Sequence, residues 1–253
     1  MCDYGRLNFE YLTSPERLLE PEIFSGDKLQ PADWKTVISH TALQLRHFSG
    51  RDIAIVASGR MTNEELWLTA RLAQQLNASF IDIVPRKGEG DDILLSQDRN
   101  PNTNGAKIML GLEGTTGASL EAIAASVAEG RIKALVVLGE DPTEFGITVE
   151  QLKKLPLQRL NRAVRPPGQA REDWEILRDL LQEFTGSNGF GSIEDVFRQM
   201  AESLQPLAGL SLSKIGDLGV KVMATPESSA TPSPPGEPSD EEFFERPPLH
   251  AVK

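Results

Sequence analysis

Two short segments of the sequence carry side chains of the types that bind phosphate groups. They span residues 58–63 and 139–141, and each directly follows an apolar run. Serine, glycine, arginine and asparagine at a strand–helix junction suit an anion, because backbone N–H groups, a helix N-terminus and a guanidinium can all face it. The alternative is that Gly59 and Asn63 only form the turn and that solvent surrounds Arg60.

Both segments are expected at the same edge of a sheet. In an open parallel α/β sheet, ligands bind in the crevice beyond the C-terminal ends of the strands. The segments would then line a crevice of the kind that holds a nucleotide. The candidate cofactor-binding residues are Ser58, Arg60, Asn63, Gly139, Glu140 and Asp141.

Other motifs of known chemistry are missing from the sequence. It contains neither a G-x-G-x-x-G fingerprint nor a P-loop, and it has no G-x-S-x-G elbow of a serine hydrolase. His40, His47 and His250 make no ligand spacing with one another or with Cys2. The residues therefore predict no catalytic group and no metal site formed by this chain alone.

The elements that must position the two segments alternate between helices and strands. Apolar residues recur at helical spacing over 32–47, and a capping box at Thr62 and Glu65 begins another helix. A third helix is predicted over 120–130. Short runs rich in β-branched residues predict buried strands over 52–58, 79–84 and 132–139. This order is typical of an α/β layer with a parallel sheet.

The rest of the chain departs from this alternation. The connection over 85–117 is too long for a simple crossover, and connections of that length are usually functional. Helices are predicted over about 170–185 and about 192–205, where a glycine and a capping box mark the boundaries. Residues 219–253 are rich in proline and acids, which predicts a disordered tail. Phe243–Phe244 within it could form a short docking motif.

The composition excludes several classes of protein. The 253 residues hold 26 Lys and Arg against 37 Asp and Glu, and this net charge of −11 disfavours binding to nucleic acid. A single cysteine excludes an internal disulfide framework. No apolar run approaches the roughly 18 residues of a membrane span, and the first residues lack the basic start and apolar stretch of a signal peptide. We expect a soluble protein of the cytosolic type.

Several stretches, taken in order, resemble one family. They are MCDYGR at 1–6, ERLLEP at 16–21, SGRMTNEELWLTARLA at 58–73, NPNTNGA at 100–106, IKALVVLGEDP at 132–142 and LQRLNRAVRPPGQAREDWEIL at 157–177. Together they resemble the large iron–sulfur subunit of bacterial NADH:quinone oxidoreductase, which belongs to the molybdopterin oxidoreductase family. The resemblance covers residues 1–218, and formate dehydrogenases and nitrate reductases are its more distant relatives.

The resemblance implies a fold and a domain organisation. The fold is a partial doubly wound parallel sheet of the molybdopterin-oxidoreductase type, followed by a helical segment and the tail. Residues 1–30 would be the junction with an iron–sulfur segment, and residues 31–218 the α/β domain, incomplete near residue 155. Cys2 matches the fourth ligand of a 4Fe-4S cluster. Since such a cluster needs four thiolates, we expect it only in a longer product.

The function implied is respiratory electron transfer from NADH through iron–sulfur clusters to quinone. This chain would be the scaffold domain, inactive in isolation, and its partners would be the other peripheral-arm subunits. They would hold it on the cytoplasmic side of the inner membrane without insertion. A strand and a cofactor-facing loop of the family pattern are absent after residues 147–156, and Cys2 is the only cysteine. Both departures argue against bound molybdopterin.

Two alternatives remain open. The chain could be a fragment of a molybdopterin-dependent oxidoreductase of the formate dehydrogenase kind, whose pterin-nucleotide crevice the six candidate residues would line. It could also be a non-catalytic, decayed remnant, because the loss of a central strand leaves unpaired sheet edges that favour aggregation. Molybdenum content after expression tests the first alternative, and a broad thermal transition would support the second.

Overall fold

The computed structural model describes residues 19–25, 28–91, 93, 95–148, 159–160, 168–187 and 189–215. Cys2 and the predicted tail over 219–253 lie outside these ranges. The chain divides into two compact units between Gly191 and Ser192, and each unit is described by itself. Among the described residues, no helix combines the length and the apolar character that crossing a membrane requires.

A parallel sheet lies at the centre of the first unit. Its strands are β3 (Ile53–Ala57), β4 (Phe80–Ile83), β5 (Ala134–Leu138) and β6 (Arg159–Leu160). They lie in the order β4-β3-β5-β6, and all three pairings are parallel. The three strands predicted from apolar runs are confirmed. The two-residue strand β6 was not predicted, and it pairs with the end of β5 shortly after the place where the family pattern loses a strand.

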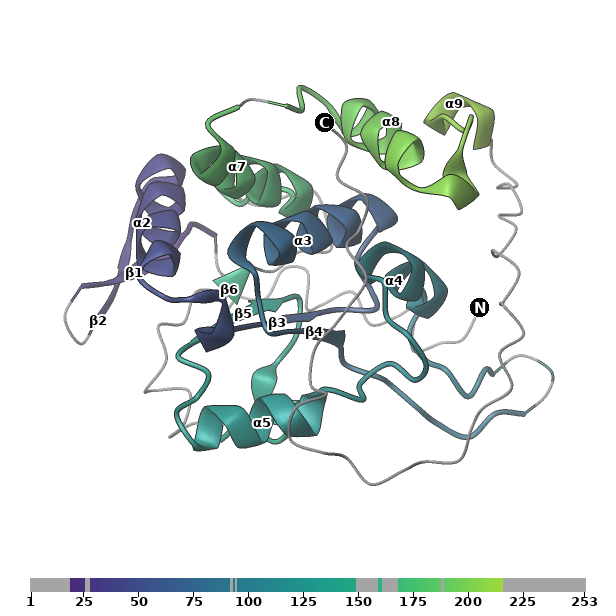
Figure 1. The fold of residues 1–253 in the computed structure, drawn as a ribbon, viewed down its shortest axis with the longest axis horizontal. Helices are drawn as coiled ribbons and strands as arrows, with labels where there is room; N and C mark the ends of the chain where they lie inside the picture. The colour runs from purple at the N-terminus through teal and green to yellow at the C-terminus, as the bar shows by residue number, and fades with distance from the viewer. Residues whose placement is uncertain are drawn as a thin grey trace. The chain divides into compact units, whose positions relative to one another are not determined.

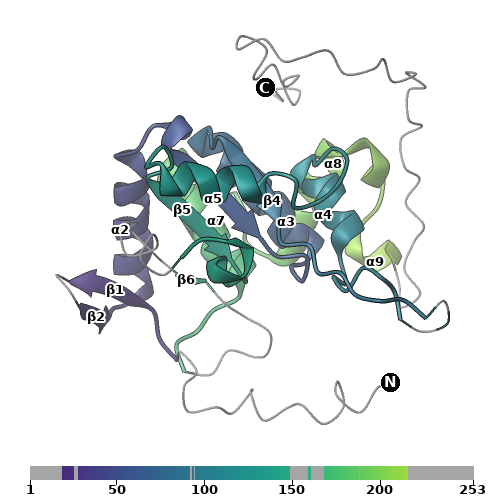
Figure 2. The ribbon, with the colours of Figure 1, turned by 90° about the horizontal axis from the view of Figure 1, so that it is seen from below.

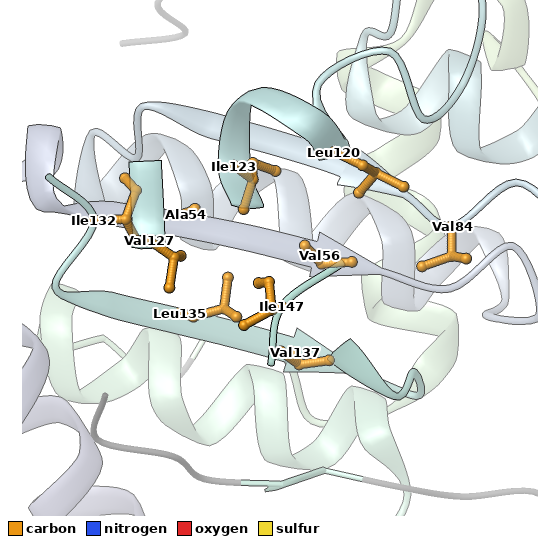
Figure 3. Packing of buried hydrophobic residues seen from close by; sticks show 10 residues of the cluster. All are labelled: Ala54, Val56, Val84, Leu120, Ile123, Val127, Ile132, Leu135, Val137 and Ile147. Atoms are coloured by element: carbon orange, nitrogen blue, oxygen red, sulfur yellow. The ribbon is translucent and has the colours of Figure 1, made fainter. Parts of the chain in front are cut away.

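Helices cover both faces of this sheet (Figure 1). Helix α5 (Leu120–Ala128) lies on one face, and α3 (Asn63–Leu76) lies on the other. The central strands β3 and β5 are accordingly continuous apolar runs without alternation, as expected when both faces are buried. Figure 3 shows the core under α5. It contains Ala54, Val56, Val84, Leu120, Ile123, Val127, Ile132, Leu135, Val137 and Ile147.

Helix α3 is buried on more than one side. It begins at the predicted capping box, in which Thr62 Oγ1 accepts from the Glu65 N–H and Glu65 Oε2 accepts from the Thr62 N–H. It packs against α4 and α7 as well as the sheet. Its buried residues are Leu66, Trp67, Leu68, Thr69, Leu72, Ala73 and Leu76. Its buried residues lie on more than one side because α4 and α7 cover the helix as well as the sheet.

Two further predicted helices, α2 (Trp34–Arg46) and α7 (Asp173–Thr185), pack against each other. The aromatic rings at the margins of α7 are only partly buried. Guanidinium groups cover them, since Arg178 lies 5.2 Å from the ring centre of Trp174 and Arg46 lies 5.1 Å from that of Phe184. Cation–π contacts thus cover the partly exposed faces of these two aromatic rings.

The long connection after β4 contains structure that the sequence did not predict. Helix α4 (Thr103–Leu110) lies within it, preceded by an arm closed by an antiparallel bridge between Lys87 and Asp98. The Asn-Pro-Asn-Thr-Asn-Gly start of this helix has low helical propensity, which concealed it. The connection is therefore a helical crossover with an insertion.

Strand β4 forms an edge of the sheet among the described strands, and it carries a buried carboxylate. Asp82 Oδ1 accepts from the N–H groups of Ile83 and Gly117, both at 2.8 Å, and Oδ2 accepts from the Ser119 N–H at 2.8 Å. These three backbone donors satisfy the buried charge. It also fixes the loop that leads into α5.

An antiparallel hairpin precedes the α/β layer. It consists of β1 (Glu22–Ser25) and β2 (Lys28–Pro31), and it lies beside α2 (Figures 1 and 2). The second unit contains α8 (Ile193–Ser203), the 3₁₀ helix η4 (Gln205–Leu207) and the short α9 (Leu212–Ile215). Helix α8 begins at the predicted capping box, where Ser192 Oγ accepts from the Asp195 N–H.

Candidate functional site

The loops that follow the three long strands meet at the C-terminal edge of the sheet. Ser58 and Arg60 follow β3, Gly139 and Glu140 follow β5, and Arg86 follows β4. Side-chain contacts join all three loops. This is the edge at which open α/β sheets bind their ligands.

A buried ion pair connects the loop after β4 to the loop after β5. Arg86 donates from Nη1 to Glu140 Oε1 at 2.7 Å and from Nη2 to Oε2 at 2.5 Å. The Glu140 side chain is 0% exposed and that of Arg86 is 27% exposed. A guanidinium that binds both oxygens of a carboxylate makes a short, strong and directional pair. The two loops are thereby fixed to each other across β3.

Arg60 lies beside this pair and faces solvent. Its Nη2 donates to the Gly139 carbonyl at 2.8 Å and lies 3.7 Å from Glu140 Oε2. Its backbone N–H donates to Ser58 Oγ at 3.1 Å, and its Nε lies 3.4 Å from the same oxygen. The side chain nevertheless stays 57% exposed. Arg60 is thus held along one edge of its guanidinium while the remainder faces solvent.

The turn after β5 approaches the turn after β3 closely. Gly139 has a φ of +66°, and a Cβ at this position would lie 3.4 Å from the Ser58 Cβ. The left-handed backbone favours glycine here, whereas a Cβ would make only an ordinary van der Waals contact with Ser58. Ser58 is itself buried, and its hydroxyl is engaged by Arg60.

An amide cluster packs against the loop after β3. Asn102 Nδ2 donates to the Met61 carbonyl at 2.9 Å and to Asn63 Oδ1 at 3.0 Å. Asn100 Nδ2 donates to the Val84 carbonyl at 2.8 Å, while its buried Oδ1 has no partner in the described part of the chain. A Cβ on Gly59 would lie 2.6 Å from the Asn100 side chain. The start of α4 is therefore fitted tightly against the loop after β3.

Two acidic groups near the site have different environments. Asp141 Oδ1 accepts from the N–H and the hydroxyl of Thr143, at 2.9 and 2.7 Å, and so caps the 3₁₀ helix η3 (Pro142–Phe145). Glu64 lies in the first turn of α3, where burial raises the pKa of its carboxyl. The surroundings of Glu64 thus disfavour its charged form.

The structure brings four of the predicted residues into contact, namely Ser58, Arg60, Gly139 and Glu140. Asn63 bonds to Asn102 and Asp141 caps η3, so neither contacts the Arg60 guanidinium in the described contacts. Sequence reasoning did not identify Arg86, Asn100 or Asn102 as site residues. The length of the connection over 85–117 was the signal that could have directed attention to them.

The arrangement suits a single anion better than a metal. Arg60 offers exposed N–H groups, whereas the Glu140 carboxylate is fully buried. In the described part of the chain, no three His, Cys, Asp or Glu side chains group closely enough to hold a metal ion. The one cysteine can supply only one of the four thiolates of a 4Fe-4S cluster, so this chain's donors do not fit that cluster.

Comparison with known proteins finds partial similarity to oxidoreductase subunits. No family model matches the chain. It is 34% identical over 79 residues to F420-dependent formate dehydrogenase 2 subunit alpha of Methanococcus maripaludis, covering 30% of this chain and 12% of that protein. It is 32% identical over 77 residues to probable oxidoreductase YjgC of Bacillus subtilis, covering 29% and 8%. NADPH-Fe(3+) oxidoreductase subunit alpha of Geobacter sulfurreducens is 34% identical over 93 residues, covering 35% and 10%.

The chain therefore matches only about a tenth of the length of these relatives. Their shared description is that of an oxidoreductase, and two of the three are alpha subunits. About a third of this chain is thus similar to part of larger oxidoreductase proteins, one of them a formate dehydrogenase.

Proposed function

We propose that this chain is a scaffold domain of an oxidoreductase subunit of the formate dehydrogenase kind, and that its crevice binds the phosphate groups of a nucleotide-bearing cofactor. The observation that carries the proposal is the Arg60 guanidinium, which is 57% exposed yet anchored by Gly139 O and Ser58 Oγ. An arginine anchored at the C-terminal edge of a parallel sheet is positioned to bind phosphate.

The start of α4 supports the same proposal. The N-cap residue of this helix is Asn102, whose side chain does not bond to the helix's first N–H groups. Its Nδ2 instead bonds to the loop that carries Arg60. The start of α4 thus helps to hold the loop that carries Arg60 in place.

The cofactor class follows from the resemblance to molybdopterin oxidoreductases. When bound, a pterin-nucleotide cofactor would supply the redox chemistry, and the residues of this chain would bind and orient its phosphate groups. Asn63 and Glu140 are engaged by Asn102 and Arg86. Arg60 is thus the residue in direct contact with the anion under this proposal.

The second candidate is the scaffold domain of a component similar to the large iron–sulfur subunit of NADH:quinone oxidoreductase. The ordered stretches that resemble that subunit favour it, as does the single cysteine, which leaves no second thiolate in the domain. Co-expression with the remaining peripheral-arm subunits tests it. Failure of the chain to co-purify with them would reject this candidate.

Calorimetric titration with GDP and with guanosine tests the proposed crevice. We expect GDP to bind and guanosine to bind at least about tenfold more weakly, because the phosphates supply the charge-assisted hydrogen bonds. Arg60→Gln should weaken GDP binding by about tenfold or more. Arg131→Gln is a matched control, because Arg131 has a similar exposure of 60% but precedes β5 at the opposite edge of the sheet.

Equal binding of GDP by the wild type and the Arg60→Gln variant would reject the crevice. Expression in a host that makes molybdopterin, followed by measurement of molybdenum in the purified protein, tests the cofactor class separately. A protein that binds GDP but carries no molybdenum would retain the anion site and exclude the formate dehydrogenase kind of cofactor for this chain.

A further inference from the structure

We propose that Arg86 is a positioning residue for the anion site, because it saturates the buried Glu140 carboxylate and so leaves Arg60 available to the ligand. This inference rests on the proposed function, since it concerns the residue that binds the anion there. Arg86 itself was not among the residues that the sequence indicated.

The competition between the two arginines follows from their distances to Glu140. Both Glu140 oxygens receive N–H groups from Arg86, at 2.7 and 2.5 Å. Arg60 Nη2 stands 3.7 Å from Oε2 and donates instead to the Gly139 carbonyl. A carboxylate that is 0% exposed has no access to water and requires a cation. Arg86 supplies that cation, and Arg60 remains farther from the carboxylate.

The backbone around Arg86 keeps this arginine in place. The Arg86 carbonyl accepts from the Arg99 N–H at 2.8 Å, within the bridged arm that follows β4. Asn100, directly after Arg99, bonds to the Val84 carbonyl at 2.8 Å. The segment before and after Arg86 is therefore fixed at two points, whereas the Arg60 side chain is fixed at one edge only.

Removal of Arg86 should redirect Arg60. With Glu140 still charged and buried, the Arg60 guanidinium is the nearest cation in the described contacts, and it would move from Gly139 O towards the carboxylate. Its exposed N–H groups would then be lost to a ligand. Replacing Glu140 by a neutral residue at the same time removes the carboxylate that competes with the ligand for Arg60. The N–H groups of Arg60 should then be available to the ligand again.

The test is calorimetric titration of inorganic pyrophosphate into the wild-type chain and four variants at fixed ionic strength. We expect Arg86→Gln to bind about tenfold more weakly, as loss of a charge-assisted hydrogen bond predicts. The double variant Arg86→Gln/Glu140→Gln should recover binding to within about threefold of the wild type. Glu140→Gln alone should bind at least as tightly as the wild type. Arg60→Gln should bind about tenfold or more weakly.

The outcomes separate this inference from the proposed function. If Arg60→Gln binds like the wild type, the anion site is wrong. If only Arg60→Gln weakens binding, the anion site stands and the role of Arg86 is wrong. A double variant as weak as Arg86→Gln would show that Arg86 contacts the anion directly, which also overturns the inference.

Folding of the variants is checked by cooperative thermal unfolding. Should Arg86→Gln not fold, Arg86→Lys replaces it. A lysine keeps the charge but cannot bind both oxygens in the guanidinium geometry, so weaker pyrophosphate binding is again expected. Binding within twofold of the wild type by a folded Arg86→Lys variant, together with no gain in Glu140→Gln, would overturn the inference.

Discussion

The two ends of the central sheet carry the same kinds of charged residue in different settings. At the N-terminal end, Lys133 Nζ lies 3.1 Å from Asp52 Oδ1, and Arg131 Nε lies 2.6 Å from Glu129 Oε2. Arg131 and Glu129 are mostly exposed, and Lys133 is more than half exposed. At the C-terminal end, the Glu140 carboxylate is fully buried.

The difference in burial bears on what each pair contributes to folding. Exposed pairs contribute little and cost little. A buried pair carries a desolvation penalty that can exceed its attraction, so an apolar pair of similar volume would often be at least as stable. The buried Glu140–Arg86 pair is therefore better explained by the fixed placement of the loops and of Arg60 than by a gain in folding free energy.

The largest expected effect breaks the buried pair. Arg86→Gln should lower the free energy of unfolding by up to about 3–5 kcal/mol, because it removes the cation that binds both oxygens of a buried carboxylate. Arg60 can replace that cation only by giving up its bond to the Gly139 carbonyl. Arg131→Gln at the other end should change the free energy of unfolding by less than about 1 kcal/mol. Denaturant unfolding followed by circular dichroism measures both. Similar values for the two variants would contradict the contrast between the ends of the sheet.

A smaller effect is expected from glycine substitutions at the two ends. Gly105→Ala should destabilise by about 1–3 kcal/mol, because its Cβ would lie 2.1 Å from Asn63 Oδ1 and 2.2 Å from Asn102 Oδ1. Gly130→Ala should cost about 1 kcal/mol from its φ of +73° alone, since its Cβ would meet nothing within 4 Å. Alanine ordinarily stabilises a helix relative to glycine, so a gain in stability for Gly105→Ala would disprove the tight fit of α4.

The smallest expected effect is the dependence of stability on pH, and its sign should differ between the two ends of the sheet. Burial raises the pKa of Glu64, so its charged form destabilises the fold as pH rises through the folded-state pKa. Glu64→Gln should therefore raise Tm at pH 7, with the gain disappearing below about pH 4. Hydrogen bonds from Lys133 and Ser49 lower the pKa of Asp52, which stabilises the fold above its unfolded-state pKa.

Asp52→Asn should accordingly lower Tm at pH 7, and this loss should also fade as pH falls through the lowered pKa of Asp52. Thermal scans of both variants from acidic to neutral pH measure the two effects. Shifts of the same sign for Glu64→Gln and Asp52→Asn would contradict the assigned environments.

Local pattern predicted much of the fold. The capping boxes at Thr62 and Ser192 could be predicted because each needs only a Ser or Thr side chain and an acidic residue three positions later in the chain. The three long strands could be predicted because burial on both faces selects short runs rich in apolar residues. Helix α4 and strand β6 could not be predicted in this way, since α4 begins with poor helix formers and β6 contains only two residues.

The candidate site was predictable in part for the same reason. Ser58, Arg60, Gly139 and Glu140 follow strands, and parallel topology alone brings such positions to one edge. Arg86 and Asn102 lie inside a long connection, and nothing local indicates which loop their side chains will reach. Their roles depend on contacts across 54 and 39–41 residues of sequence.

The sequence by itself determined the α/β class, the positions of the three long strands, the capping boxes that begin α3 and α8, and the presence of one arginine where a phosphate could bind. These follow from periodicity, capping and chain direction, which act over a few residues. Only the tertiary structure decided that Glu140 is buried and that Arg86 binds both of its oxygens while Arg60 lies farther away. Burial and the choice between two cations depend on which loops pack together, and that is settled by the whole fold rather than by neighbours in the chain.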